Sequence, residues 1–284
     1  MRFCRAHSLD EALEWLSEWG EDGRLLAGGT DLMLQYRLGE VTPGALISIE
    51  GIKAVSSITA DARTGIGALA THSTLAADAG IASHHPALAM AARLVGGWQT
   101  QATGTVGGNI CNASPAADLA PPLLIADAHV TLASKRGERR LPLEEFFLDR
   151  RTTARRPDEL LTEIDLEPLP PRGGESYVKL GRRGAMDVAI VGLAVRLRLG
   201  RDDTIEAARV AVCSLAATPR RVPNAEAALL GARLEAGALA DAGGALMASV
   251  TPIDDARGTA SYRRRVLPGL LEQALMQCGE EIRQ

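Results

Sequence analysis

The first place where this sequence could do chemistry is a pair of glycines between a strand-like run and a helix-like run. The turn consists of Ala27, Gly28, Gly29, Thr30 and Asp31. Glycine tolerates a positive φ and lets other groups approach the backbone closely, and the N-terminus of a following helix offers unpaired N–H donors and a favourable dipole. A phosphate group would fit such a turn.

A second glycine turn has the same character and adds hydroxyl and amide groups. It runs from Thr103 through Gly104, Thr105, Val106, Gly107 and Gly108 to Asn109. The two turns together could hold one pyrophosphate, although each turn alone is more typical of an ordinary tight turn, in which Gly-Gly is common. Neither turn matches the G-x-G-x-x-G pattern, so the sequence does not favour a Rossmann dinucleotide fold.

Cysteine and histidine spacing argues against a metal centre. The four cysteines are scattered without a C-x-x-C pair, and the five histidines show no ligand spacing. We therefore expect no iron-sulfur cluster, zinc site or disulfide framework in this chain. His72 lies between Thr71 and Ser73, where helix capping explains the hydroxyls without a catalytic role.

The composition bounds the remaining possibilities. A chain of 284 residues that is 46% hydrophobic and 23% charged is typical of a soluble globular protein, and its length fits two domains or one large domain with a subdivision. The formal net charge of -4 disfavours a nucleic-acid surface. No segment approaches the roughly 20 apolar residues that span a bilayer. These features predict a cytoplasmic location and no membrane span.

Mixed helices and strands must position the two turns in the first half of the chain. Ser8 and Glu11 fit a capping box at the start of a helix. Periodicity predicts helices over residues 8–19, 31–36, 73–79, 86–95 and 118–126, and strands over residues 24–27, 45–49, 55–59, 65–68 and 129–133. A glycine-rich loop is expected over residues 96–109.

The Pro-Pro-Arg-Gly-Gly stretch at residues 170–174 is the best candidate domain boundary. It divides the chain into residues 1–172 and 173–284. Strands are expected over residues 177–180, 188–199 and 207–215, and helices over residues 225–230, 234–248 and 262–278. Strands followed by helices predict an α+β second domain with an antiparallel sheet.

Four stretches, taken together and in this order, resemble the FAD-binding medium subunits of the molybdenum hydroxylase family, the xanthine dehydrogenase and carbon monoxide dehydrogenase group. They are AGGTDL, TVGGNICNASPAADLAPPLL, YVKLGRRGAMDVAIVGLAVRL and DDARGTASYRRRVL. The resemblance implies an α+β fold, with a para-cresol methylhydroxylase-type FAD-binding domain of two α/β subdomains that divide within about residues 50–60. A smaller C-terminal domain of the carbon monoxide dehydrogenase flavoprotein type would follow.

The resemblance also implies how FAD is held. The two glycine turns would bind the pyrophosphate and ribityl chain, with the flavin between the two domains. Asp118 would hydrogen-bond the cofactor, although an aspartate at a helix N-terminus is favoured there in any case. Leu161 would pack on the adenine, and a plain core leucine is the alternative reading.

Two residues of the third stretch would lie near the flavin ring. Lys179 matches a lysine at the polar edge of the isoalloxazine, where a cation would stabilise the electron-rich reduced ring, although a surface lysine is the competing interpretation. Asp187 and Val188 match the segment that reaches toward the flavin. Carbon monoxide dehydrogenases tend to have tyrosine at the Val188 position, and its absence here would suit hydride transfer to a nicotinamide.

The implied role is an electron relay. Substrate would be oxidised on a molybdopterin-containing large subunit, a small subunit with [2Fe-2S] clusters would carry the electrons, and FAD here would pass them to an external acceptor such as NAD. The arginines of 150–151, 155–156 and 263–265 could face these partners, but a solvated surface is the better interpretation.

Two rival functions stay open. A self-contained FAD-dependent oxidase would need its own substrate pocket and a base near the flavin, for which the second domain offers no obvious candidate. An assembly or interaction protein that has lost FAD would not need the intact glycine turns.

Overall fold

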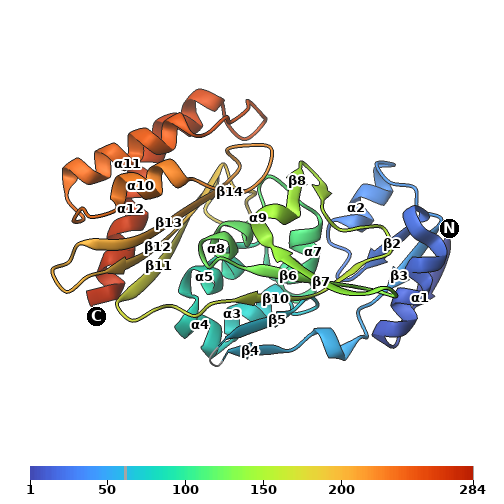
Figure 1. The fold of residues 1–284 in the computed structure, drawn as a ribbon. Helices are drawn as coiled ribbons and strands as arrows, with labels where there is room; N and C mark the ends of the chain where they lie inside the picture. Colours follow the sequence, from blue (N-terminus) through green and yellow to red (C-terminus); the bar gives the residue numbers. More distant parts are fainter. Residues whose placement is uncertain (61–62, 284) are drawn as a thin grey trace.

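The computed structural model describes residues 1–60 and 63–283, which form three larger sheets and one two-stranded sheet with helices packed against them (Figure 1). The first sheet is parallel, with the strand order β1-β3-β2. Its strands are β1 (Arg2–Arg5), β2 (Gly23–Leu26) and β3 (Ala45–Ser48). The helices of this part are α1 (Leu9–Trp19), α2 (Leu32–Arg37) and the 3-10 turns η1 (Gly20–Asp22) and η2 (Lys53–Val55).

The start of α1 confirms the predicted capping. The Ser8 hydroxyl accepts a hydrogen bond from the Glu11 backbone N–H at 3.2 Å, and the Glu11 carboxylate accepts one from the His7 N–H at 2.8 Å. Leu13 and Leu16 on the inner face of α1 are buried against Ile47 of β3. Because β2 pairs with β3, this packing holds β2 and the glycine turn that follows it in place.

The second sheet is antiparallel, with the order β4-β5-β10-β6-β7. Its strands are β4 (Ile58–Ala60), β5 (Thr64–Gly67), β6 (His129–Ser134), β7 (Gly137–Pro142) and β10 (Leu160–Leu166). The small hairpin beside it pairs β8 (Phe147–Asp149) with β9 (Thr152–Thr153). The helices are α3 (His72–Ala77), α4 (Ala79–His84), α5 (Pro86–Leu94), α6 (Trp98–Thr103), α7 (Val106–Cys111), α8 (Ala120–Ile125) and α9 (Leu143–Phe146).

The third sheet is antiparallel with the order β11-β12-β13-β14, and three helices cover one of its faces (Figure 1). Its strands are β11 (Gly173–Leu180), β12 (Val191–Leu199), β13 (Ile205–Cys213) and β14 (Arg220–Arg221). The helices are α10 (Pro223–Leu229), α11 (Ala236–Ala248) and α12 (Ala260–Arg283). Leu267, Leu271 and Leu275 recur every four residues along α12, so they share the face that packs on the sheet.

The two faces of β12 serve different cores. Val191, Leu193 and Val195 belong to the core beneath α10–α12, whereas Ala194 belongs to the core of the second sheet and helices α5 and α8. Successive side chains of a strand point to opposite faces, and the small alanine lets the sheet approach those helices. The mixed α+β architecture with antiparallel sheets is confirmed. The division of the chain at residue 172 stays a prediction.

Several local expectations were wrong. Residues 96–109 are not a loop but contain α6 and α7, because the Thr105 side chain caps α7 by accepting from the Gly108 N–H at 3.0 Å. The strand expected at residues 55–59 starts only at Ile58, since η2 occupies the preceding residues. Strand β7 was not expected, because it is an edge strand of mainly polar residues and lacks the alternation of apolar residues that predicts a strand.

Arg263 corrects the expectation of a solvated arginine cluster. Its side chain is buried, and its Nη1 donates to the backbone carbonyls of Ile190 at 2.7 Å and Ser214 at 2.9 Å. Its Nη2 donates to Asp255 at 2.6 Å. Over residues 1–60 and 63–283, no helix has both the length and the apolar character that crossing a bilayer requires.

Replacing Leu275 with alanine should lower the free energy of unfolding by about 3 kcal/mol, because it leaves a cavity between α12 and the third sheet. Met276 is 39% exposed on the same helix, so Met276→Ala should cost less than about 1 kcal/mol. Urea denaturation of both variants measures the difference. Equal losses would contradict the packing described for α12.

Candidate cofactor site

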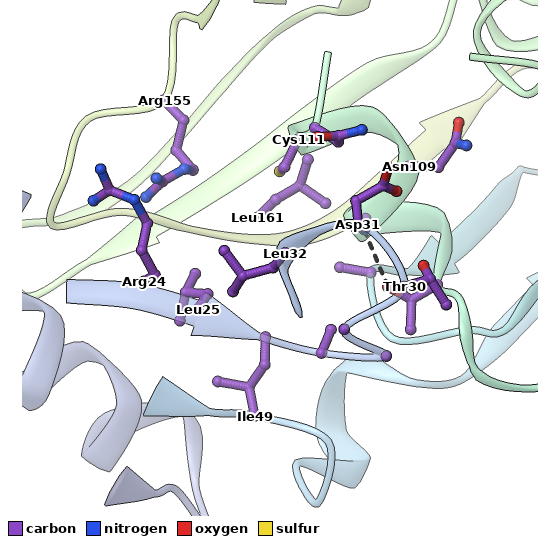
Figure 2. Close-up of a pocket in the computed structure, with 18 of the residues that line it drawn as sticks. Arg24, Leu25, Thr30, Asp31, Leu32, Ile49, Asn109, Cys111, Arg155 and Leu161 are labelled. Carbon is purple, nitrogen blue, oxygen red and sulfur yellow. Dashed lines mark hydrogen bonds between the residues drawn. The ribbon is translucent and has the colours of Figure 1, made fainter. Parts of the chain in front are cut away.

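The two glycine turns are far apart in sequence, but both line a single cavity of about 610 Å³. The first turn joins β2 to α2, and the second runs from the end of α6 into the first turn of α7. Figure 2 shows Thr30 and Asp31 of the first turn opposite Asn109 of the second. The folding of the chain therefore creates the paired arrangement that a pyrophosphate would need.

Gly28 allows the two turns to touch. A Cβ atom built at this position would lie 1.8 Å from the carbonyl oxygen of Thr103, which no real side chain could tolerate. The neighbouring Gly29 has a φ of +67°, a left-handed conformation that favours glycine. The first Gly-Gly pair is thus required by a backbone contact and by a backbone conformation.

The second turn is anchored to the end of β5. The N–H groups of Val106 and Gly107 donate to the carbonyls of Ala70 and Ala68 at 2.9 and 2.8 Å. A Cβ at Gly107 would lie 2.7 Å from the Cβ of Ala68, whereas the neighbour of a Cβ at Gly108 would be the Thr105 hydroxyl at 2.9 Å. Gly107 is needed for packing, and Gly108 lines the cavity.

Two buried polar atoms in the cavity wall have no partner within residues 1–60 and 63–283. They are Oδ1 of Asn109 and Nδ1 of His72. Buried polar groups are normally hydrogen-bonded, so these atoms indicate a wall built around a polar ligand. Burial lowers the pKa of His72 to about 4, which keeps its imidazole neutral near pH 7.

Most of the predicted site residues are brought together. Those that line the cavity are Ala27, Gly28, Gly29, Thr30, Asp31, Thr105, Gly107, Gly108, Asn109 and Leu161. Val106 is buried behind the turn instead, where it contributes to the core. Asp118, Lys179 and Val188 lie apart from this cavity, near the junction with the third sheet.

A second cavity, of about 270 Å³, opens at that junction. One wall comes from Arg93 and Leu94 at the end of α5 and from Gly96 and Gly97, and the other comes from Lys179 of β11 and residues 184–187. Val95 and Thr100 line the first cavity while Leu94, Gly97 and Gln101 line the second, so the two cavities adjoin along the same segment.

A buried ion pair holds one side of the second cavity. The Lys179 Nζ donates to Asp118 Oδ2 and to the Leu94 carbonyl, both at 2.7 Å, and the Tyr177 hydroxyl donates to Asp118 Oδ1 at 2.7 Å. The side chains of Lys179 and Asp118 are only 6% and 8% exposed. Burial raises the pKa of Asp118, although the adjacent Lys179 cation opposes this shift.

Asp118 therefore binds Lys179 and Tyr177 and does not face either cavity. Both of its oxygens already accept hydrogen bonds from side chains of β11, and it lies behind the walls of the two cavities rather than in them. Lys179 is not the surface lysine of the competing interpretation, since it is buried and lines the second cavity. Val188 is 53% exposed and Trp98 is 80% exposed, and each directly follows in sequence a residue that lines this cavity.

Comparisons with known proteins agree with this geometry. Residues 1–169 match the family described as "FAD binding domain in molybdopterin dehydrogenase", and residues 175–278 match "CO dehydrogenase flavoprotein C-terminal domain". The chain belongs to this family. It is an oxidoreductase flavoprotein subunit, and its cofactor is FAD.

Relatives match along almost the whole length. The chain is 32% identical to the 6-hydroxypseudooxynicotine dehydrogenase complex subunit alpha of Paenarthrobacter nicotinovorans, over 95% of this chain and 91% of that protein. It is 30% identical to the xanthine dehydrogenase FAD-binding subunit of Escherichia coli O157:H7, over 96% of this chain and 94% of that one. A solved carbon monoxide dehydrogenase from Hydrogenophaga pseudoflava covers 99% of this chain and 98% of its own, with 30% identity and a TM-score of 0.94.

The cavities fit FAD in shape and in chemistry. Within the described residues, the backbone N–H groups of Gly28, Gly29 and Thr30 have no recorded partner, so the first turn can donate to a pyrophosphate. The N–H groups of the second turn from Val106 to Asn109 already donate within the fold, and this wall instead offers the unpartnered Asn109 and His72 side-chain atoms. Sequence reasoning missed His72, Arg24, Arg151 and Arg155 in the cavity wall. Arginine pairs in the sequence looked like solvated charges, and only the fold shows which of them turn toward the cavity.

Replacing Gly28 with alanine should weaken FAD binding by roughly tenfold or more, because the methyl group would push the Thr103 carbonyl away and separate the turns. Titration of the deflavinated chain with FAD measures this. A Cβ built at Gly269 in α12 would have open space around it in the part of the chain that the structure describes. Gly269→Ala is therefore the matched control and should bind FAD normally. Normal FAD affinity in the Gly28 variant would exclude the close contact of the two turns.

Replacing Lys179 with methionine should lower the free energy of unfolding by about 3 to 5 kcal/mol, because Asp118 would be left buried without its cation. The pKa of Asp118, already raised by burial, would rise further. The folded state would then hold a proton that the unfolded state releases above the ordinary carboxyl pKa of about 4, so stability falls as pH rises.

The loss in this variant should therefore be larger at about pH 8 than at about pH 5, as measured by urea denaturation of the deflavinated chain. Lys53 is exposed, so Lys53→Met is a control that should change stability little at either pH. A loss for Lys179→Met that does not depend on pH would mean that Asp118 is not the group left uncompensated.

Proposed function

We propose that this chain is the electron-transfer subunit of a molybdenum hydroxylase, which receives electrons from [2Fe-2S] clusters of a small subunit and passes them to an external acceptor such as NAD. The substrate would be oxidised on a molybdopterin-containing large subunit. The observation that carries this proposal is the second cavity, which adjoins the FAD cavity and is bordered by exposed side chains.

The second cavity is suited to the flavin ring. It adjoins the first cavity along residues 94–101, and it lies between the α5–α6 segment and the residues at the end of β11. Bound there, FAD would supply a centre that accepts electrons singly and releases them as a pair. Exposed Trp98, Met186 and Val188 nearby offer a surface to which other proteins or a small acceptor could come close.

Lys179 is positioned to tune such a ring. An ammonium group has three N–H donors, and Asp118 and the Leu94 carbonyl use two of them. The third donor is left for the cavity that Lys179 lines. A cation there would favour the electron-rich reduced flavin, and Asp118 would hold its position.

The names of the relatives support the proposal that this chain assembles with partner subunits. They include a dehydrogenase complex subunit, a xanthine dehydrogenase FAD-binding subunit and carbon monoxide dehydrogenase medium chains, all matched over more than nine tenths of their length. A chain that matches such subunits from end to end fits the same place in an assembly. The self-contained oxidase lacks comparable support.

The side chain at Val188 favours a nicotinamide as the acceptor. It is small and 53% exposed, so it leaves room beside the second cavity that a tyrosine would fill. A nicotinamide ring must stack against the flavin for hydride transfer, because the reacting atoms need to be about 3 to 3.5 Å apart. The Val188 position is therefore the place to test acceptor access.

Anaerobic addition of NADH to the FAD-loaded chain should bleach the flavin absorbance, since hydride transfer between NAD and flavin runs in both directions. Val188→Tyr should slow this bleaching at least about tenfold without lowering the FAD content. Leu148 is exposed in β8 and lines neither of the two cavities described above, so Leu148→Tyr is the matched surface control. It should leave the rate of bleaching unchanged.

Failure of NADH to reduce the flavin would exclude NAD as the acceptor. The relay itself is tested by isolating the chain with its natural partners. Substrate should reduce the flavin only in the assembled complex. Turnover of that substrate by the isolated FAD-loaded chain would contradict the relay and favour the self-contained oxidase.

A further inference from the structure

One end of the FAD cavity is lined by residues that belong to neither glycine turn. Arg24 and Arg155 line this end, together with the apolar side chains of Leu25 and Leu161. Figure 2 shows the two arginines on the far side of the leucines from Thr30 and Asn109. They come from opposite walls, Arg24 from β2 and Arg155 from the segment between β9 and β10.

Both guanidinium groups are held in place and keep unused donors. Arg155 Nη1 donates to the carbonyls of Arg156, Pro157 and Glu159 at 3.0, 3.4 and 2.7 Å. Arg24 Nη1 donates to the carbonyls of Glu21 and Gly23. Within the described residues, the recorded partners of both side chains are thus backbone carbonyls reached through Nη1, and Nε and Nη2 remain for a ligand.

The order of the cavity parts identifies what this end receives. The second cavity adjoins the first at residues 94–101, the glycine turns follow, and the arginines lie beyond the leucines. FAD is a linear molecule in which the pyrophosphate separates the flavin from the adenosine. With the pyrophosphate at the glycine turns and the flavin at the second cavity, the adenosine must point toward Arg24 and Arg155.

We propose that Arg24 and Arg155 form an adenine clamp, in which their guanidinium groups enclose the base of FAD against Leu25 and Leu161. This inference rests on the proposed function for its placement of the flavin ring. The clamp makes the site selective for the dinucleotide over flavin mononucleotide, which has no base at that end.

The chemistry of the two arginines suits a purine. A planar guanidinium group stacks on aromatic faces, and its fork of N–H donors can also reach ring nitrogens. Leu25 and Leu161 offer an apolar surface to the other face of the base. A general electrostatic role toward phosphate would act on FAD and flavin mononucleotide alike, so the two roles can be separated by experiment.

The test is calorimetric titration of the deflavinated full-length chain with FAD, ADP and flavin mononucleotide. Arg24→Gln and Arg155→Gln should each weaken FAD and ADP binding about tenfold and leave flavin mononucleotide binding unchanged. Arg150 lies outside the cavity wall and is exposed, so Arg150→Gln is the matched control and should bind all three ligands normally.

Arg155→Lys keeps the positive charge but not the planar group, so it separates the effect of stacking from the effect of charge. It also serves as a second variant in case Arg155→Gln does not fold. The clamp predicts weaker FAD and ADP binding in this variant as well. Equal losses for FAD and flavin mononucleotide, or full recovery with lysine, would overturn the clamp, as would unchanged FAD binding in both glutamine variants. Failure of the electron relay would show in the NADH reaction, which can fail while this selectivity persists.

Discussion

The contact between Gly28 and the Thr103 carbonyl is the constraint on which the cofactor site depends. Two turns that belong to different parts of the fold meet there, backbone against backbone, and a single methyl group would part them. The contact brings the N–H groups of the first turn and the polar side chains of the second to one cavity, and it sets the direction along which the remaining parts of the cofactor must extend.

The site also depends on the buried ion pair between Lys179 and Asp118, at the junction of the second and third sheets. Lys179 of β11 reaches across to Asp118 before α8 and to the end of α5, so one cation links three elements. Removing a charge pair from water is costly, and a buried pair is retained only where its hydrogen bonds are complete. Here the pair fixes a cation beside the cavity assigned to the flavin, and Tyr177 completes the bonding of Asp118.

Much of the candidate site was predictable because its signals are local. Paired glycines, the capping residues Ser8 and Glu11 and the alternation of strand residues are each visible within a few neighbours. Asp118 was predicted to hydrogen-bond the cofactor, and its side-chain partners in the fold could not be known, because Tyr177 and Lys179 lie 59 and 61 residues away in sequence. The distinction between Arg155 in the cavity wall and Arg150 outside it depends on the path of the chain around β9, which no periodicity reveals.

The sequence by itself determined the types of turn, the amphipathic elements and, through its resemblance to a family, the cofactor. These properties depend on backbone preference and on side-chain periodicity, which act over short distances along the chain. Only the tertiary structure decided that both turns share one cavity, that Lys179 is buried and that Arg263 is internal. Such facts depend on packing between distant elements, and the energy of a buried charge is set by those neighbours rather than by the residues beside it in sequence.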